Sequence, residues 1–167
     1  MLKRLVGLRI FLLFVAGLTI QTHAAEKIGD WTYVEQADPL TDKVLQAIYI
    51  YEMNGAANVR LRVACSPSFQ KSFGYDFGGL MVGSRNTVMI QYRVDSEPAS
   101  GNLFPRLFNG NRSANINLEM ADKLAIQMQH GETLFIRVTD IFDNTSKDHY
   151  FSLSGFAEAF EKVICKR

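Results

Sequence analysis

The sequence has few of the residues on which catalytic and metal sites usually depend. Only His130 and His149 lie outside the N-terminal 24 residues, and the chain has two cysteines. These are a weak basis for a zinc site, which needs three or four ligands within reach. The sequence also lacks a Gly-x-Ser-x-Gly elbow, a Gly-rich phosphate loop and a His-Glu-x-x-His pair. We therefore expect no cofactor, no metal ion and no catalytic centre.

Three weaker chemical hypotheses concern two histidines and one pair of acidic residues. His130 precedes Gly131, a natural helix stop, so we expect its ring to bond the last carbonyl groups of a helix. His149 borders a strand in a polar stretch, and we expect it at the surface. Asp95 with Glu97 could form the acidic pair of a cell-wall hydrolase. Acidic residues at strand ends are usually solvated, so we rank a cell-wall hydrolase third among the functions considered.

The chain also lacks an excess of basic residues, with 18 Lys and Arg against 17 Asp and Glu. Without the first 24 residues, which hold three basic and no acidic residues, 15 basic and 17 acidic residues remain, a net charge of −2. Nucleic-acid-binding proteins normally carry a basic excess. We therefore expect no nucleic acid among the partners.

A long hydrophobic run is missing too. The run from 10 to 20 has 11 residues, whereas a membrane-spanning helix needs about 20. It follows Lys3, Arg4 and Arg9 and precedes a small residue, Ala24, which is the pattern of a secretory signal peptide. We expect a signal peptide at 1–24 and a single periplasmic domain at 25–167 in a Gram-negative cell, with no transmembrane span after cleavage. An uncleaved N-terminal anchor is the alternative.

Export would place Cys65 and Cys165 in an oxidising compartment, where a disulfide can persist. Their separation of 100 residues is unlike the close spacing of a redox pair. We expect a structural disulfide between them. Two free thiols, or a bond to another molecule, are the alternatives.

The remaining sequence is rich in short alternating segments joined by turns rather than by helical crossovers. We expect seven strands, at 30–35, 44–52, 59–65, 73–80, 87–95, 133–139 and 149–153. Two short strands are allowed near 103–108 and 113–117, and 140–148 is expected to be a loop. A helix is expected at 118–130 and a second one at the C-terminus. This pattern predicts a mostly-β or α+β fold, an antiparallel sheet or β-sandwich of about seven strands with two helices, one of them C-terminal.

The last segment is expected to close the core. Its apolar residues fall on one helical face, namely Phe156, Ala159, Phe160, Val163 and Ile164. We expect Ser154 to cap the start of this helix with its hydroxyl. The single tryptophan, Trp31, is expected to pack in the core near the start of the domain.

Arginines alternate with apolar residues in three of the predicted strands. Arg60, Arg62, Arg93 and Arg137 all face away from the apolar side of their strands. If those strands are neighbours, the four side chains form an arginine stripe that could bind carboxylate or phosphate groups of a partner. The alternative is that they are ordinary polar-face residues paired with nearby acids.

Several short motifs resemble one family. They are the strand 61–65 ending in cysteine, the strand 88–95 with Tyr92-Arg93-Val94-Asp95, the strand 134–138, and the segment 151–160 that turns into a helix before Cys165. Their order and spacing, with Trp31 near the start, resemble the VasI/TagO type of periplasmic proteins associated with type VI secretion. The chain departs from that pattern at 102–117, where Leu103-Phe104-Pro105 replaces a tryptophan-containing stretch.

The resemblance implies a non-enzymatic periplasmic accessory protein that binds a protein partner in the cell envelope, within a type VI secretion system or another envelope machine. It also implies the Cys65–Cys165 bond. The alternative function is a periplasmic inhibitor or immunity protein that blocks a cell-wall hydrolase.

Overall fold

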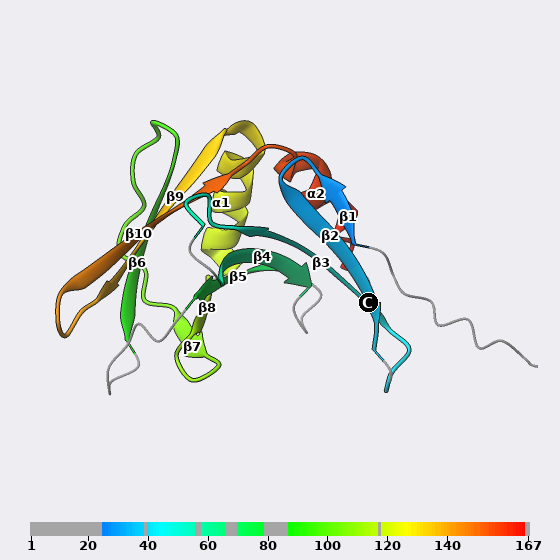
Figure 1. Cartoon of the computed structure of the whole chain (residues 1–167), viewed down its shortest axis with the longest axis horizontal. Helices are drawn as coiled ribbons and strands as arrows, with labels where there is room; N and C mark the ends of the chain where they lie inside the picture. The colour runs from blue at the N-terminus through cyan, green and yellow to red at the C-terminus, as the bar shows by residue number, and fades with distance from the viewer. Residues whose placement is uncertain are drawn as a thin grey trace, which may run out of the picture.

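A computed structural model describes residues 25–38, 40–55, 58–65, 70–78, 87–116 and 118–165. Within these residues the chain forms ten strands, in one antiparallel sheet of seven and one of three, and two helices (Figure 1). The predicted signal peptide at 1–24 and the predicted end of one strand at 79–80 lie outside the described residues. The mostly-β antiparallel fold with two helices, the last of them C-terminal, is confirmed.

The seven-stranded sheet is built from both early and middle parts of the chain. In spatial order its strands are β1 (Glu26–Ile28), β2 (Trp31–Ala37), β3 (Val44–Tyr51), β4 (Val59–Cys65), β5 (Lys71–Phe77), β8 (Ser113–Ile116) and β7 (Arg106–Phe108). The β7–β8 hairpin adds to β5, so the segment between β5 and β7 leaves this sheet and returns to it.

The strand between β5 and β7 in the chain, β6 (Val88–Val94), belongs to the three-stranded sheet. The order of this sheet is β10 (Thr145–Ser152), β9 (Thr133–Asp140) and β6. Helix α1 (Leu118–His130) follows β8, and helix α2 (Phe156–Lys162) follows β10. In Figure 1 the small sheet and α1 lie on one side of the curved large sheet, and α2 lies beside β1 and β2.

One hydrophobic core joins these elements because the apolar sides of both sheets and both helices face each other. Leu61 and Tyr75 of the large sheet, Ile136 of the small sheet, Leu124 of α1 and Phe156 of α2 are all fully buried. The arginine-bearing sides of the strands therefore face outward on two separate sheets.

Residues 140–148 form a hairpin and not the predicted loop. Strand β9 continues to Asp140, which pairs with Thr145, and β10 begins at Thr145. The first four residues of β10, Thr145 to Asp148, are all exposed. A strand that is solvated on both faces has no apolar alternation, so the sequence pattern could not reveal it.

The two ends of the domain meet where two glycine turns contact each other. Gly29, at φ 56°, precedes β2, and Gly155, at φ 81°, precedes α2. A Cβ on Gly29 would lie 2.4 Å from the Ser154 carbonyl oxygen, and one on Gly155 would lie 2.3 Å from the Ile28 carbonyl oxygen. The Asp30 amide donates to the Ser154 carbonyl at 3.1 Å. Glycine at both positions thus allows two backbones to touch.

The predicted cap at Ser154 is wrong. The residue that starts α2 is Gly155 in a left-handed conformation, with no side-chain capping bond. Ser154 instead presents its carbonyl to Asp30 of the first turn. The tight approach of the two turns therefore determines the start of this helix, and a local hydroxyl does not.

Trp31 sits in the core as predicted and ties the two ends together. Its ring is fully buried, with its centroid 4.9 Å from that of Phe156. Its indole N–H donates to the Ser152 carbonyl at 3.2 Å, across 121 residues of sequence. The Ser152 hydroxyl in turn donates to the Asp30 carboxylate at 2.5 Å.

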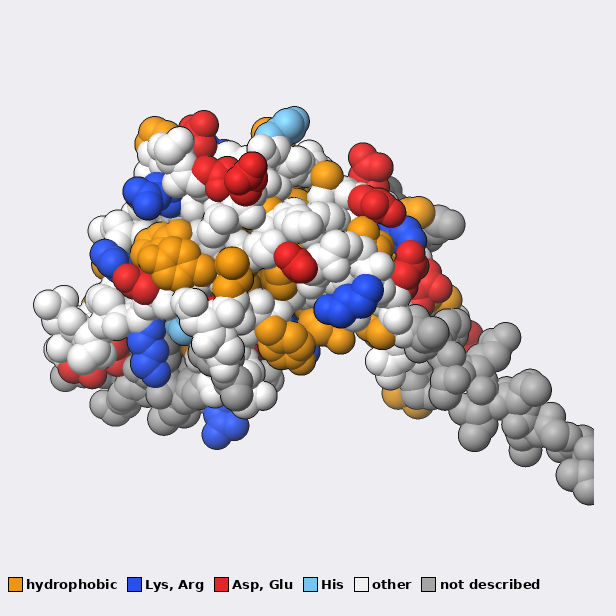
Figure 2. All heavy atoms as spheres, turned by 45° about the horizontal axis from the view of Figure 1, so that its top comes forward, with side chains coloured by type: hydrophobic (Ala, Val, Ile, Leu, Met, Phe, Trp, Pro, Cys, Tyr) orange, Lys and Arg blue, Asp and Glu red, His pale blue; other side chains and the backbone are white. Residues whose placement is uncertain are grey.

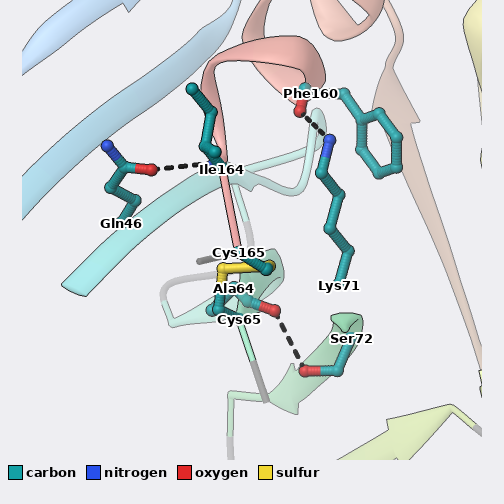
Figure 3. The surroundings of a disulfide bond; sticks show 8 residues. All are labelled: Gln46, Ala64, Cys65, Lys71, Ser72, Phe160, Ile164 and Cys165. Atoms are coloured by element: carbon teal, nitrogen blue, oxygen red, sulfur yellow. Dashed lines mark hydrogen bonds between the residues drawn. A yellow bond between two sulfur atoms is a disulfide. The ribbon is translucent and has the colours of Figure 1, made fainter. Parts of the chain in front are cut away.

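Past α2 the chain runs to the predicted disulfide, which is present (Figure 3). Cys65, at the end of β4, and Cys165 have Cα atoms 5.4 Å apart. The Ile164 amide donates to Gln46 Oε1 at 2.8 Å, and Lys71 Nζ donates to the Phe160 carbonyl at 2.6 Å. The helix ends at Lys162, so Ile164 leaves the predicted apolar face and is 54 % exposed.

We predict that Cys165→Ala lowers the free energy of unfolding by about 2–4 kcal/mol, because the bond closes a long loop in the unfolded chain. Thermal unfolding and limited proteolysis of the C-terminal segment measure the loss. Reducing the parent protein should reproduce it, and the reductant should not affect the variant. Equal stability of variant and oxidised parent would contradict the role of the disulfide.

We also predict that Gly155→Ala destabilises the protein more than Gly55→Ala does. Both glycines have positive φ, 81° and 76°, so both substitutions carry the same backbone strain of about 1 kcal/mol. A Cβ at Gly55 meets nothing within 4 Å, whereas one at Gly155 meets the Ile28 carbonyl. Chemical denaturation measures the free energy of unfolding of both variants, and their difference is the cost of the steric clash at Gly155. If both variants lose the same stability, the two turns can move apart without cost.

Candidate functional site

The four predicted arginines do not form one stripe. Arg60 and Arg62 lie on β4 in the seven-stranded sheet, whereas Arg93 on β6 and Arg137 on β9 lie in the three-stranded sheet. The premise that their three strands are neighbours is wrong, because β4 pairs with β3 and β5, and β6 pairs with β9. The structure therefore offers two arginine-bearing faces.

The first face is the outer side of the seven-stranded sheet, which we term the large-sheet face. Directly opposed residues of neighbouring antiparallel strands share one face. One row across it runs Tyr49–Arg62–Gly74–Asn115, and the next runs Tyr51–Arg60–Asp76–Ser113. The core lies on the opposite side of these strands. The large-sheet face is thus polar, with arginine and tyrosine at its centre.

Arg60 and Arg62, the two arginines of β4, are held differently. Arg60 donates from Nε and Nη2 to Asp76 Oδ2, at 2.9 and 2.6 Å, and its guanidinium lies 5.6 Å from the Tyr49 ring centroid. Arg62 lies over Gly74, with Nη2 3.4 Å from where a Cβ would be. No described carboxylate pairs with Arg62, which leaves its charge available.

A hollow of about 440 Å³ opens on this face. It is lined by Tyr51, Asn58, Arg60, Asp76, Gly78, Asn109, Arg112 and Ser113. The Ser113 hydroxyl donates to Asp76 Oδ1 at 2.6 Å, and the Asn109 amide donates to Ser113 at 3.1 Å. These bonds join the β7–β8 hairpin to β5 and fix the polar lining in place.

The second face is the outer side of the three-stranded sheet, which we term the small-sheet face. Arg137 forms a two-point ion pair with Asp148 on β10, with N–O distances of 2.7 and 2.6 Å. The bond to Arg137 lowers the pKa of Asp148, and the same bond raises the pKa of Arg137. Phe135 and Tyr150 lie beside this pair, with ring centroids 5.2 Å apart. The ion pair and the rings together give the face a fixed central surface.

Arg93 lies next to this group. It pairs in register with Phe135 on β9, is exposed, and has no ion-pair partner among the described residues. A hollow of about 400 Å³ is lined by Gln91, Tyr92, Arg93, Ala99, Phe135, Arg137, Asp148 and Tyr150. Figure 2 shows a group of apolar side chains over this sheet with basic and acidic side chains beside it.

His149 lies in the core between the two sheets, so its predicted surface position is wrong. It is 5 % exposed, and its ring centroid is 6.0 Å from that of Tyr75 on β5. Burial lowers the pKa of His149 and raises that of Tyr75. The sequence did contain a signal for this burial. Residues two apart in a strand face the same side, and His149 lies two residues before the inward-facing Phe151.

Two other residues singled out in the sequence have local structural roles. His130 Nδ1 lies 2.9 Å from the Ile126 carbonyl oxygen in the last turn of α1, which confirms its predicted contact. The Asp95 carboxylate accepts hydrogen bonds from the amides of Glu132 and Thr133 at 2.9 and 2.8 Å. Asp95 therefore fastens the end of β6 to the start of β9.

The described residues offer neither a cluster of metal ligands nor a membrane-spanning helix. No group of three or more His, Cys, Asp or Glu lies close enough to hold a metal ion. No helix among the same residues has the length and apolar character needed to cross a membrane.

Comparison with known proteins gives a likeness in fold. No family model and no curated protein matches the sequence. Among solved structures, the chain is similar to the invasion associated protein B of Bartonella henselae, with a TM-score of 0.56 and 12 % sequence identity. The match covers 84 % of this chain and 95 % of that one. An identity this low supports a shared fold and no closer relationship.

We predict that acid lowers the stability of the parent protein because His149 is buried. Because burial lowers its pKa below the ordinary value of about 6.5, the unfolded chain takes up the proton first, and the free energy of unfolding falls as the pH drops through that value. Glu52 and Asp148 oppose this shift, and Lys147 adds to it. Melting temperatures between pH 7.5 and 5.5 should fall for the parent and change less for His149→Leu.

The control is His130→Gln, which removes an exposed histidine from the end of α1. It should keep the pH dependence of the parent. A His149→Leu protein whose melting temperature falls as steeply as that of the parent would show that other groups cause the effect.

Proposed function

We propose that this chain is an exported, non-enzymatic accessory protein of the cell envelope that binds a protein partner through the small-sheet face. The observation that carries the proposal is one hollow with three features around it. They are Arg93, which has no ion-pair partner among the described residues, the Phe135–Tyr150 rings and the Arg137–Asp148 pair. Export rests on the signal-peptide pattern at 1–24 and on the disulfide.

The composition of this face supports protein binding. Aromatic residues and arginine are enriched at the centres of protein interfaces and supply most of their binding energy. Tyr150 is 41 % exposed, and the Arg137 guanidinium lies 5.5 Å from the Phe135 ring centroid. Arg93 has no described acid partner, so the complementary surface would offer a carboxylate to it.

The construction of the sheet also suits binding by contact. Arg137 and Asp148 hold each other across β9 and β10, and the buried side of both strands packs into the single core. A surface that is already ordered loses less conformational entropy when a partner binds. This preorganisation would raise affinity without any chemistry at the site.

The resemblance to VasI/TagO-type proteins suggests the machine that this protein would serve, a type VI secretion system or another envelope assembly. The disulfide that the resemblance implies is present. The fold is shared with a protein whose name associates it with invasion, which agrees with action outside the cytoplasm. Capture of partners from a periplasmic extract would test this, since an envelope-machine component supports the proposal and a cell-wall hydrolase favours the inhibitor alternative.

We predict that Arg93→Glu combined with Arg137→Glu abolishes partner binding and leaves the fold intact. The double change turns the positive side of the hollow negative and places a second carboxylate against Asp148, which should cost at least about 2 kcal/mol of binding free energy. Calorimetric titration of the captured partner measures the loss, and circular dichroism checks the fold.

The matched control is Arg62→Glu combined with Arg112→Glu, which changes the net charge equally on the large-sheet face. It should leave partner affinity unchanged. If both pairs weaken binding equally, overall charge explains the effect; if neither does, the small-sheet face is not the binding surface. Arg93→Glu alone avoids disturbing the ion pair and should still weaken binding.

A further inference from the structure

We propose that the hollow of the large-sheet face binds a saccharide unit that carries a carboxylate. The site would use Tyr51 as an apolar platform, Asp76 and Ser113 as hydrogen-bonding groups, and Arg60 with Arg112 as the cationic side. This site lies on a different sheet from the proposed protein-binding face.

The lining of the hollow indicates a hydrophilic ligand. Sites for drug-sized molecules have volumes of about 300–1,000 Å³ and are lined predominantly by apolar side chains. The hollow here, at about 440 Å³, is lined mainly by arginine, asparagine, aspartate and serine. Together these side chains offer both hydrogen-bond donors and acceptors, which is what a ring bearing many hydroxyl groups requires.

The polar groups are ordered before any ligand arrives. Asp76 accepts from Arg60 on one oxygen and from Ser113 on the other, and Asn109 donates to Ser113. Each of these side chains is therefore held in one orientation by its neighbours. Such fixed groups reduce the entropy lost when a ligand binds.

Tyr51 supplies the apolar surface that a sugar ring also needs. It is 52 % exposed, and its ring lies edge-on to Tyr49 with a centroid distance of 5.7 Å. An aromatic ring that is half exposed can pack against the C–H face of a sugar.

The charge of the hollow selects an acidic sugar over a neutral one. Arg60 and Arg112 face one carboxylate, Asp76, which is already paired with Arg60. Arg112 is exposed and has no ion-pair partner among the described residues, and Arg62 on the same face is also without one. A guanidinium matches a carboxylate through two parallel hydrogen bonds, so the free arginine would take the acidic group.

The test is a titration of the oxidised protein followed by amide chemical shifts, with glucuronic acid and N-acetylmuramic acid as probes. Glucose and N-acetylglucosamine are the neutral counterparts, and acetate and inorganic phosphate are anions without a sugar ring. We expect the acidic sugars to bind at least about tenfold more tightly than any of these four, with shifts in β4, β5 and β8.

Two variants locate the site. Arg112→Gln should weaken binding of the acidic sugars about tenfold or more, because it removes a charge-assisted hydrogen bond. Tyr51→Ala should weaken acidic and neutral sugars alike. Arg93→Gln, an equal change of charge on the small-sheet face, should have no effect. Both test positions are exposed, so folding should survive, and circular dichroism checks this.

Three results would overturn the proposal: no shift with the acidic sugars, equal affinity for acetate or phosphate, or binding that Arg112→Gln leaves unchanged. The second would describe a general anion site without sugar recognition. Since Arg93 and Arg137 are absent from this hollow, each of these results leaves the protein-binding proposal untouched.

Discussion

The contact between the two glycine turns is the constraint on which this fold depends. It joins the β1–β2 hairpin to the start of α2, so segments from opposite ends of the domain complete one core. Trp31 and Phe156 fill the space beneath the contact, and the disulfide fastens the same closing segment to β4. Loosening this junction would expose Trp31 and Phe156, which are among the largest fully buried side chains.

With all apolar surfaces turned to one core, both sheets present polar outer faces. The register of β3, β4 and β5 places Arg60 beside Asp76, and that of β9 and β10 places Arg137 beside Asp148. Each arginine of these pairs is held by an acid on the next strand, while Arg62 and Arg93 have no ion-pair partner among the described residues. The two faces thus combine a fixed ion pair with an available charge.

Alternation predicted most strands and the outward direction of all four arginines, because the period of a strand fixes which side each residue faces. It could not predict which strands are neighbours. The return of β8 to β5 and the pairing of β6 with β9 depend on contacts between distant segments, so the single stripe was wrong. The hollow beside Asp76 was missed for the same reason, since its lining comes from β3, β4, β5 and the β7–β8 hairpin.

The order in which the chain is made adds a consequence of the Cys65–Cys165 bond. Cys65 ends the fourth strand, and its partner is synthesised 100 residues later. Six later strands and both helices lie between the two cysteines, so the bond can close only after all of them have been synthesised. Oxidation of this pair is therefore a late step, which follows the synthesis of the closing segment.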